Sequence, residues 1–104
     1  MSDVDTWGNL RGDPVKTIQE THDNDFIEVI IYKGDKLFYY GYSLRLGTLI
    51  LRKAANIKNE SYLTAEAARS HACKEIQEVC TRSRNAQKAI VNFTRIWVQQ
   101  GELF

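Results

Sequence analysis

The chain of 104 residues contains one proline, six glycines and two cysteines, and it has no long apolar run. So little proline and glycine argues against a low-complexity or disordered chain. The longest uncharged and mostly apolar run spans residues 37–44, far short of the ~20 residues that a transmembrane helix requires. Because the first residues lack both a basic and an apolar region, we expect no signal peptide, no membrane contact and a cytoplasmic protein.

The two cysteines, Cys73 and Cys80, lie seven residues apart in a segment with helical periodicity. Two helical turns separate such residues by roughly 10 Å, whereas the Cα atoms joined by a disulfide lie within about 7 Å of each other. The pair therefore cannot form a disulfide within that helix. Reduced thiols in an intracellular protein are the simple interpretation.

Charge of one sign is not in large excess, because the formal net charge is +1. This balance excludes a histone-like polycation and an acidic mimic of nucleic acid. The charge is uneven, however, with −5 over residues 1–28 and +6 over residues 29–104. The acidic segment either solvates itself or shields a basic surface elsewhere. We expect a flexible acidic arm over residues 1–13 and a single α+β domain over residues 14–104.

The motifs of common enzymes and metal sites are missing as well. The sequence has no Gly-rich phosphate loop, no Cys-x-x-Cys pair and no His-Glu-x-x-His helix. Ser70 and Cys73 lie beside His71, but helical residues one or two apart point about 100° or 200° apart and cannot form a catalytic dyad. Glu75 and Glu78 share a helical face with His71, which is more typical of a solvated His–Glu pair than of a metal site. We therefore predict no catalytic site, no cofactor and no metal.

A β-hairpin is the clearest local signal that the sequence does contain. Lys33-Gly34-Asp35-Lys36 separates two runs with strand composition. A two-residue loop at Gly34–Asp35 would place Ile31 opposite Phe38. One face of this hairpin is then bulky and uncharged, and it consists of Ile27, Val29, Ile31, Phe38, Tyr40 and Tyr42. The other face is mixed, and a slip by one residue would destroy this separation.

A turn near Gly47 leads to a third strand, which adds Leu49 and Leu51 to the bulky face. Residues 14–21 are ambiguous between a short helix and an edge strand, and we favour the strand. The predicted fold class is therefore α+β, with an antiparallel β-meander of three or four strands followed by two helices packed on one face.

Helical periodicity begins after Thr64, a good N-cap residue. One stripe of small and apolar residues runs to Val79, and a second comprises Ala86, Ile90, Phe93 and Trp97, with Gly101 as a stop signal. A single helix over both stripes would run about 55 Å, more than twice the length of the sheet.

We therefore expect a break around residues 81–85. An unbroken helix would instead bury Phe93 and Trp97 in a homodimer. The predicted core consists of Val29, Ile31, Phe38, Tyr40, Leu51, Ala68, Ala72, Ile76, Phe93 and Trp97.

The mixed face of the sheet is the candidate binding surface. Arginine and tyrosine are enriched at protein-binding hot spots, and exposed apolar patches mark interaction sites. On this face Ile30 and Leu37 lie between the predicted binding residues, which are Tyr32, Tyr39, Arg45 and Arg52. The alternative is that the N-terminal segment covers the face with Trp7, Val15 and Ile18.

Over roughly residues 26–80, three predicted strands are followed by a helix that opens Tyr62-Leu63-Thr64-Ala65-Glu66-Ala67-Ala68. This order of elements resembles the AP2/integrase-type DNA-binding domains. In that family a three-stranded sheet lies against DNA and the helix packs behind it, so the resemblance implies nucleic-acid binding through the sheet. This chain departs from the family by lacking a densely basic sheet face and by adding a second helix.

The net charge of +1 favours a protein partner over nucleic acid, because non-specific affinity for nucleic acid comes largely from neutralised phosphates. We expect a small non-enzymatic protein-interaction or regulatory module, with nucleic-acid binding as the alternative.

Overall fold

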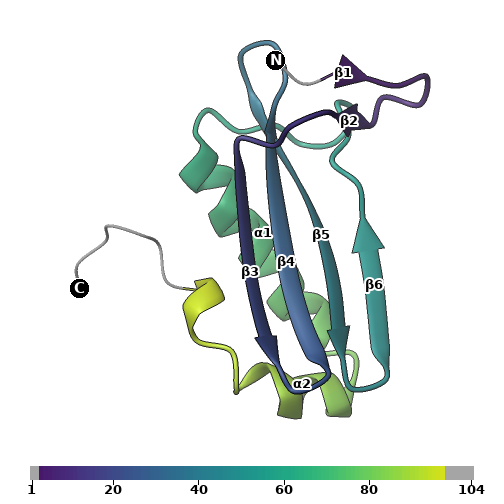
Figure 1. Cartoon of the computed structure of the whole chain (residues 1–104), viewed down its shortest axis with the longest axis vertical. Helices are drawn as coiled ribbons and strands as arrows, with labels where there is room; N and C mark the ends of the chain where they lie inside the picture. The colour runs from purple at the N-terminus through teal and green to yellow at the C-terminus, as the bar shows by residue number, and fades with distance from the viewer. Residues whose placement is uncertain (1–2, 98–104) are drawn as a thin grey trace.

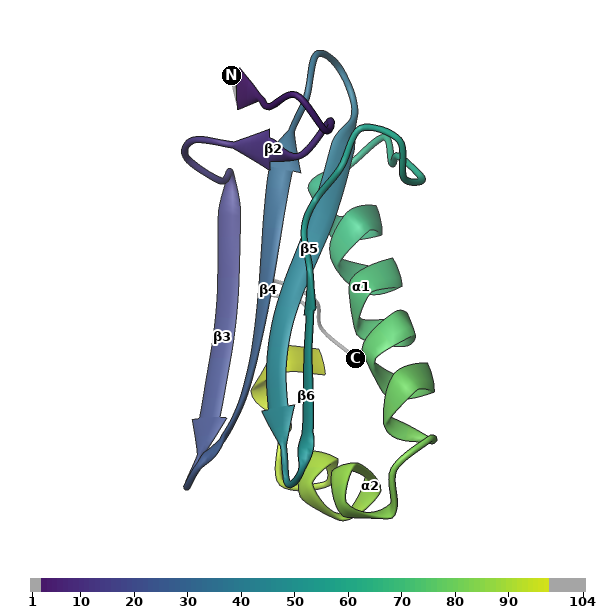
Figure 2. The same ribbon diagram turned by 90° about the vertical axis from the view of Figure 1, so that its right-hand side faces the viewer.

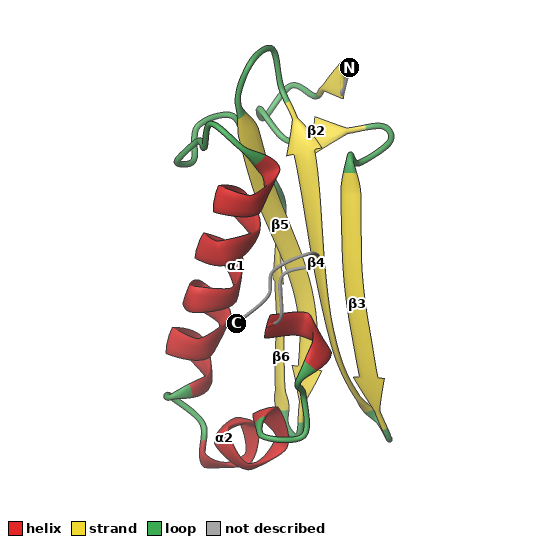
Figure 3. Cartoon of the chain, turned by 90° about the vertical axis from the view of Figure 1, so that its left-hand side faces the viewer, coloured by secondary structure: helices red, strands yellow, loops and turns green. Residues whose placement is uncertain are grey.

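The computed structural model describes residues 3–97, and within that range an antiparallel sheet is backed by helices (Figure 1). Each strand of the sheet pairs with the next one along the chain, in the order β3 (Lys16–His22), β4 (Asp25–Lys33), β5 (Phe38–Leu46) and β6 (Leu49–Lys53). The helices that follow are α1 (Ala65–Cys80), α2 (Arg84–Ile90) and the 3₁₀ turn η1 (Arg95–Trp97). They pack on one face of the sheet (Figure 3). The predicted α+β class and the order of strands before helices are confirmed.

The expected acidic arm contains a short antiparallel pair, β1 (Asp3–Val4) with β2 (Leu10–Arg11). Figure 2 shows β2 on the face of the sheet opposite α1. Leu10 is buried, and its backbone N–H donates to the carbonyl oxygen of Ala55 at 2.8 Å. The pair therefore covers one end of that face, while the flexibility of residues 1–13 stays a prediction.

The two faces of the central hairpin are as predicted, but the pairing is shifted by two residues. Ile31 lies opposite Tyr40 rather than Phe38, and Lys33 pairs with Phe38. The connecting loop therefore has four residues, and the Gly34 N–H donates to the Leu37 carbonyl across it at 2.9 Å. A shift of two preserves which side each residue faces, because side chains alternate with period two.

The core lies between α1 and the bulky face of the sheet. Ala68, Ala72 and Ile76 have no exposed surface, because small side chains allow α1 to lie close to the strands. The core residues predicted from sequence that are buried are Val29, Ile31, Tyr40, Ala68, Ala72, Ile76 and Phe93. Phe38, Leu51 and Trp97 are partly buried and pack against this cluster.

The helices break where the sequence predicts. The first ends at Cys80 and the second begins at Arg84. Ser83 caps the second helix, and its hydroxyl accepts from the Ala86 N–H at 3.3 Å. Neither this short helix nor any other within residues 3–97 is long and apolar enough to cross a membrane.

The second helix is shorter than its apolar stripe predicts. Phe93 lies in a turn beyond α2, and Trp97 belongs to η1. Both side chains pack against the core of their own chain. Because α1 ends at Cys80, the unbroken helix that would have required a homodimer does not form. The predicted stop at Gly101 lies outside the described residues.

Candidate functional site

The predicted binding residues all lie on the sheet face opposite α1, which we call the open face. Tyr32 lies opposite Tyr39, Arg45 opposite Ile50, and Arg52 opposite Ser43. The tyrosines are half-buried and the arginines are exposed. Register places on this face Thr17, Gln19, Thr21, Phe26, Glu28, Ile30, Tyr32, Tyr39, Gly41, Ser43, Arg45, Ile50 and Arg52.

The three residues that would have covered the open face do not do so. Trp7 and Val15 are exposed. Ile18 lies opposite Val29, on the core side of the sheet. Of the segments within residues 3–97, β2 and the chain that leaves β6 lie over one end of the face (Figure 2). The remainder of the face has no cover from the described part of the chain.

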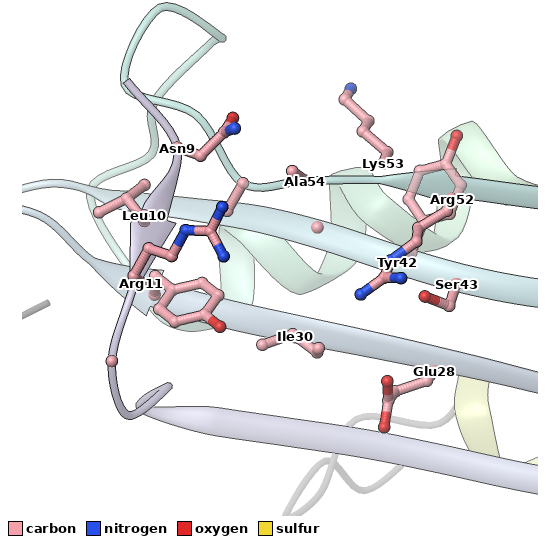
Figure 4. Close-up of a pocket in the computed structure, with 14 residues that line it drawn as sticks. Asn9, Leu10, Arg11, Glu28, Ile30, Tyr42, Ser43, Arg52, Lys53 and Ala54 are labelled. Atoms are coloured by element: carbon pink, nitrogen blue, oxygen red, sulfur yellow. The ribbon is translucent and has the colours of Figure 1, made fainter. Parts of the chain in front are cut away.

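A groove of about 620 Å³ separates β2 from the open face (Figure 4). The residues that give it its chemical character are Arg11, Glu28, Ile30, Tyr32, Ser43 and Arg52. Two predicted binding residues, Tyr32 and Arg52, therefore line this groove, whereas Tyr39 and Arg45 lie on the same face outside it. Arg11 is absent from the predicted site, because the sequence suggests only a flexible arm at its position.

Arg11 is held by Asp5, which organises the turn before β2. One carboxylate oxygen of Asp5 accepts from the backbone N–H groups of Trp7 and Asn9, each at 2.9 Å. The other accepts from Arg11 Nε at 3.1 Å and forms an ion pair with Arg11 Nη2 at the same distance. Desolvation acts to raise the pKa of Asp5, but these hydrogen bonds outweigh it, and the pKa lies below its ordinary value. The Asn56 amide donates to the Trp7 carbonyl at 3.0 Å and so ties the turn to the chain after β6.

The wall of the groove on the β6 side depends on a close backbone crossing. A Cβ atom at Gly41 would lie 2.7 Å from the carbonyl oxygen of Lys53 and 2.8 Å from the backbone nitrogen of Ala55. Real Cβ atoms do not approach backbone this closely, so glycine is required where the chain leaving β6 passes over β5.

The helix side of the sheet carries a different polar cluster, centred on Glu75 of α1. The Glu75 carboxylate accepts hydrogen bonds from the Tyr40 hydroxyl, from the Tyr42 hydroxyl at 2.7 Å, and from the Lys53 ammonium at 2.9 and 3.1 Å. Burial acts to raise the pKa of Glu75, but these donors outweigh it and lower the pKa. Burial, followed by the neighbouring carboxylate, raises the pKa of both tyrosines.

This cluster ties α1 to the strands. The Lys53 ammonium also lies 4.8 Å from the centre of the Tyr40 ring. The predicted solvated pair of His71 and Glu75 is wrong, because Glu75 turns to the sheet. The centre of the His71 ring lies 4.6 Å from the centre of the Tyr62 ring. No cluster of His, Cys, Asp or Glu in the described residues could hold a metal ion.

A buried carboxylate joins the edge strand to the end of the described chain. Glu20 of β3 is 6% exposed and accepts from the backbone N–H groups of Ile96 at 2.8 Å and Thr94 at 3.2 Å. His22 pairs with the same carboxylate at 2.8 Å. Burial acts to raise the pKa of Glu20, but these partners lower it below its ordinary value. On the other side of η1, buried Arg69 donates to the Ile96 carbonyl at 3.0 Å.

Comparisons of this chain with protein-family models, curated proteins and solved structures find no match. The site must therefore be interpreted from its own geometry.

Proposed function

We propose that this chain is a protein-interaction module that binds its partner through the open face of the sheet. The observation that carries the proposal is the pairing of Tyr32 with Tyr39 beside two exposed arginines, on a face that the described helices leave uncovered. Tyrosine offers a large contact area with little conformational entropy lost on binding, and arginine offers a rigid set of donors. No catalytic role is proposed, because the polar clusters on the helix side have structural partners.

The exposed apolar residue on this face indicates the character of the partner. Ile50 is 67% exposed and lies opposite Arg45. Covering its side chain would remove apolar surface from water, and a carboxylate beside it would pair with the arginine. We therefore expect a partner with an apolar patch that is edged by acidic residues.

Nucleic acid is the second candidate, and the arrangement of the elements favours it. The sequence resembles the AP2/integrase-type domains, which bind DNA with a strand meander that has a helix behind it. However, Glu28 lies on the same face, opposite Ser43, and its negative charge would repel phosphates. The face carries few basic side chains. The electrostatic attraction to phosphates, which dominates DNA affinity, is therefore small. For these two reasons we propose a protein partner before nucleic acid.

The test is selection from a random peptide display library on immobilised protein. Arg52→Glu, and separately Tyr39→Ala, should abolish most of the enrichment that the wild type gives. The control is Lys74→Glu, which reverses a charge at an exposed position of α1 and should leave enrichment unchanged.

Two results would count against the proposal. Equal enrichment on the wild type and on both open-face variants would show that the peptides bind elsewhere. Binding of a random DNA duplex at low salt that Arg52→Glu removes would favour the second candidate instead.

We also propose a cytoplasmic location, because both cysteines are free thiols and such thiols persist in reducing compartments. Cell fractionation with an antibody to the chain is the direct check, and recovery from an oxidising compartment would contradict it.

A further inference from the structure

The groove beneath β2 differs from the rest of the open face because two guanidinium groups face the same hollow. Figure 4 shows Arg11 reaching in from β2 and Arg52 from β6, with Ile30 of β4 between them. The two arginines come from segments that are 41 positions apart in the sequence, and the fold alone brings them together. The Lys53 ammonium lies on the other side of the sheet, where it is bound to Glu75 of α1.

Arg11 is positioned before any ligand arrives. Its side chain is 67% exposed, yet Asp5 holds two of its nitrogens. A guanidinium group has five N–H donors, so this ion pair leaves donors that can reach a ligand. Because the side chain is already ordered, less conformational entropy is lost on binding.

We infer that this groove binds an extended acidic segment of the partner protein, in which carboxylate residues alternate with uncharged ones. This inference rests on the proposed function and names the ligand chemistry of one part of the open face. In an extended chain, side chains on one side recur about every 6.8 Å. Such a segment can present carboxylates to Arg11 and Arg52, which bind them with charge-assisted hydrogen bonds, while its backbone passes over Ile30.

Glu28 is the reason that the segment must alternate. Its carboxylate lines the same groove and repels any ligand that carries a negative charge at every position. A nucleic-acid strand and a run of consecutive glutamates are both such ligands. A segment with gaps between its carboxylates carries less negative charge along its length and is repelled less by Glu28.

The probe is an eight-residue peptide of alternating glutamate and valine, labelled with fluorescein at its N-terminus and amidated at its C-terminus. Its binding to the full chain is followed by fluorescence anisotropy. Arg11→Ala and Arg52→Ala should each weaken binding roughly threefold to fivefold, the range expected for an exposed ion pair. Arg84→Ala is the control, because it removes an exposed arginine from α2, on the other side of the sheet, and it should change the affinity less than about twofold.

A second peptide, with glutamine in place of each glutamate, separates charge from shape. It should bind roughly tenfold more weakly than the acidic peptide, since it loses both charged contacts. Equal binding of the two peptides would overturn the inference. The inference would also be overturned if Arg11→Ala and Arg52→Ala bound the acidic peptide as tightly as the wild type does. Circular dichroism checks that both variants are folded.

The display selection distinguishes failure of this inference from failure of the proposed function. Selected peptides that depend on Tyr39 and Arg52 but carry no acidic residues would support binding through the open face and overturn the acidic ligand. Selected peptides with acids at alternate positions, whose binding Arg11→Ala weakens, would support both. A DNA duplex that binds the groove with the same dependence on Arg11 would overturn both.

Discussion

The two faces of one sheet treat polar side chains in opposite ways. On the helix side, Glu20 and Glu75 each accept at least three hydrogen bonds. On the other side, Arg45 and Arg52 are exposed. A carboxylate taken out of water is tolerated only when its oxygens have donors, whereas an exposed guanidinium has water. The contrast indicates which face maintains the fold, and it supports the proposal that the other face binds a partner.

The largest expected effect comes from the helix side. Phe93 is 2% exposed and packs against the core beyond α2. Phe93→Ala should lower the free energy of unfolding by about 3–5 kcal/mol, because it leaves a cavity. Urea denaturation followed by circular dichroism is the measurement. A loss below about 1 kcal/mol would show that the segment after α2 is not part of the core.

Glu20→Gln should have the next largest effect, about 1.5–3 kcal/mol at pH 7, since hydrogen bonds to a charged acceptor are lost. The pKa of Glu20 in the folded chain lies below its ordinary value of 4.5. Its contribution to stability is therefore present above pH 4.5 and is lost as the pH falls through the folded pKa.

The difference in stability between wild type and Glu20→Gln should consequently narrow below about pH 4.5. Urea denaturation of both proteins at pH 7 and pH 3.5 measures it. Titration of Glu75 is common to the two proteins and cancels in the difference. A gap that stays constant across this pH range would contradict the role given to Glu20.

Lys53→Met should cost less, about 1–2 kcal/mol, because Glu75 is only partly buried and keeps its two tyrosine donors. A double-mutant cycle with Tyr42→Phe tests whether these donors act together. Additive losses would mean that the two groups contribute independently to the cluster.

The smallest effect on stability is expected on the open face. Tyr39→Ala and Arg52→Glu should each change the free energy of unfolding by less than about 1 kcal/mol, because neither side chain belongs to the core cluster. Thermal unfolding followed by circular dichroism is sufficient. If both variants unfold the protein, the contrast between the two faces fails, and the open face is part of the fold.

Local patterns in the sequence predict the two faces well. Alternation from Ile27 to Tyr42 assigns each residue to its side, and this assignment survives the shift of two residues in pairing. The predicted two-residue loop after Lys33 was wrong, because Phe38 also forms hydrogen bonds with Tyr62 through its backbone N–H and its carbonyl. No local pattern shows that a residue 24 positions away will occupy the edge of a strand.

The same limit explains which site residues the sequence does not predict. Arg11 gains its position from Asp5 and, through the turn, from Asn56. Glu20 is acidic in a strand that alternates weakly, so its burial depends on donors that arrive from Thr94 and Ile96. Tyr32, Tyr39, Arg45 and Arg52 could be placed because face and register were sufficient for them.

The hydrogen bond between Glu20 and Ile96 spans 76 positions, and this separation has a consequence while the chain is being made. The ribosome adds about 5–20 residues each second, so Ile96 is joined about 4–15 s after Glu20. Hairpins among β3 to β6 need only near neighbours and can form in microseconds. For those seconds the carboxylate on β3 lacks its final donors and remains hydrated. The nascent sheet therefore has an ionised group on its future core side until the last turn of the described chain emerges.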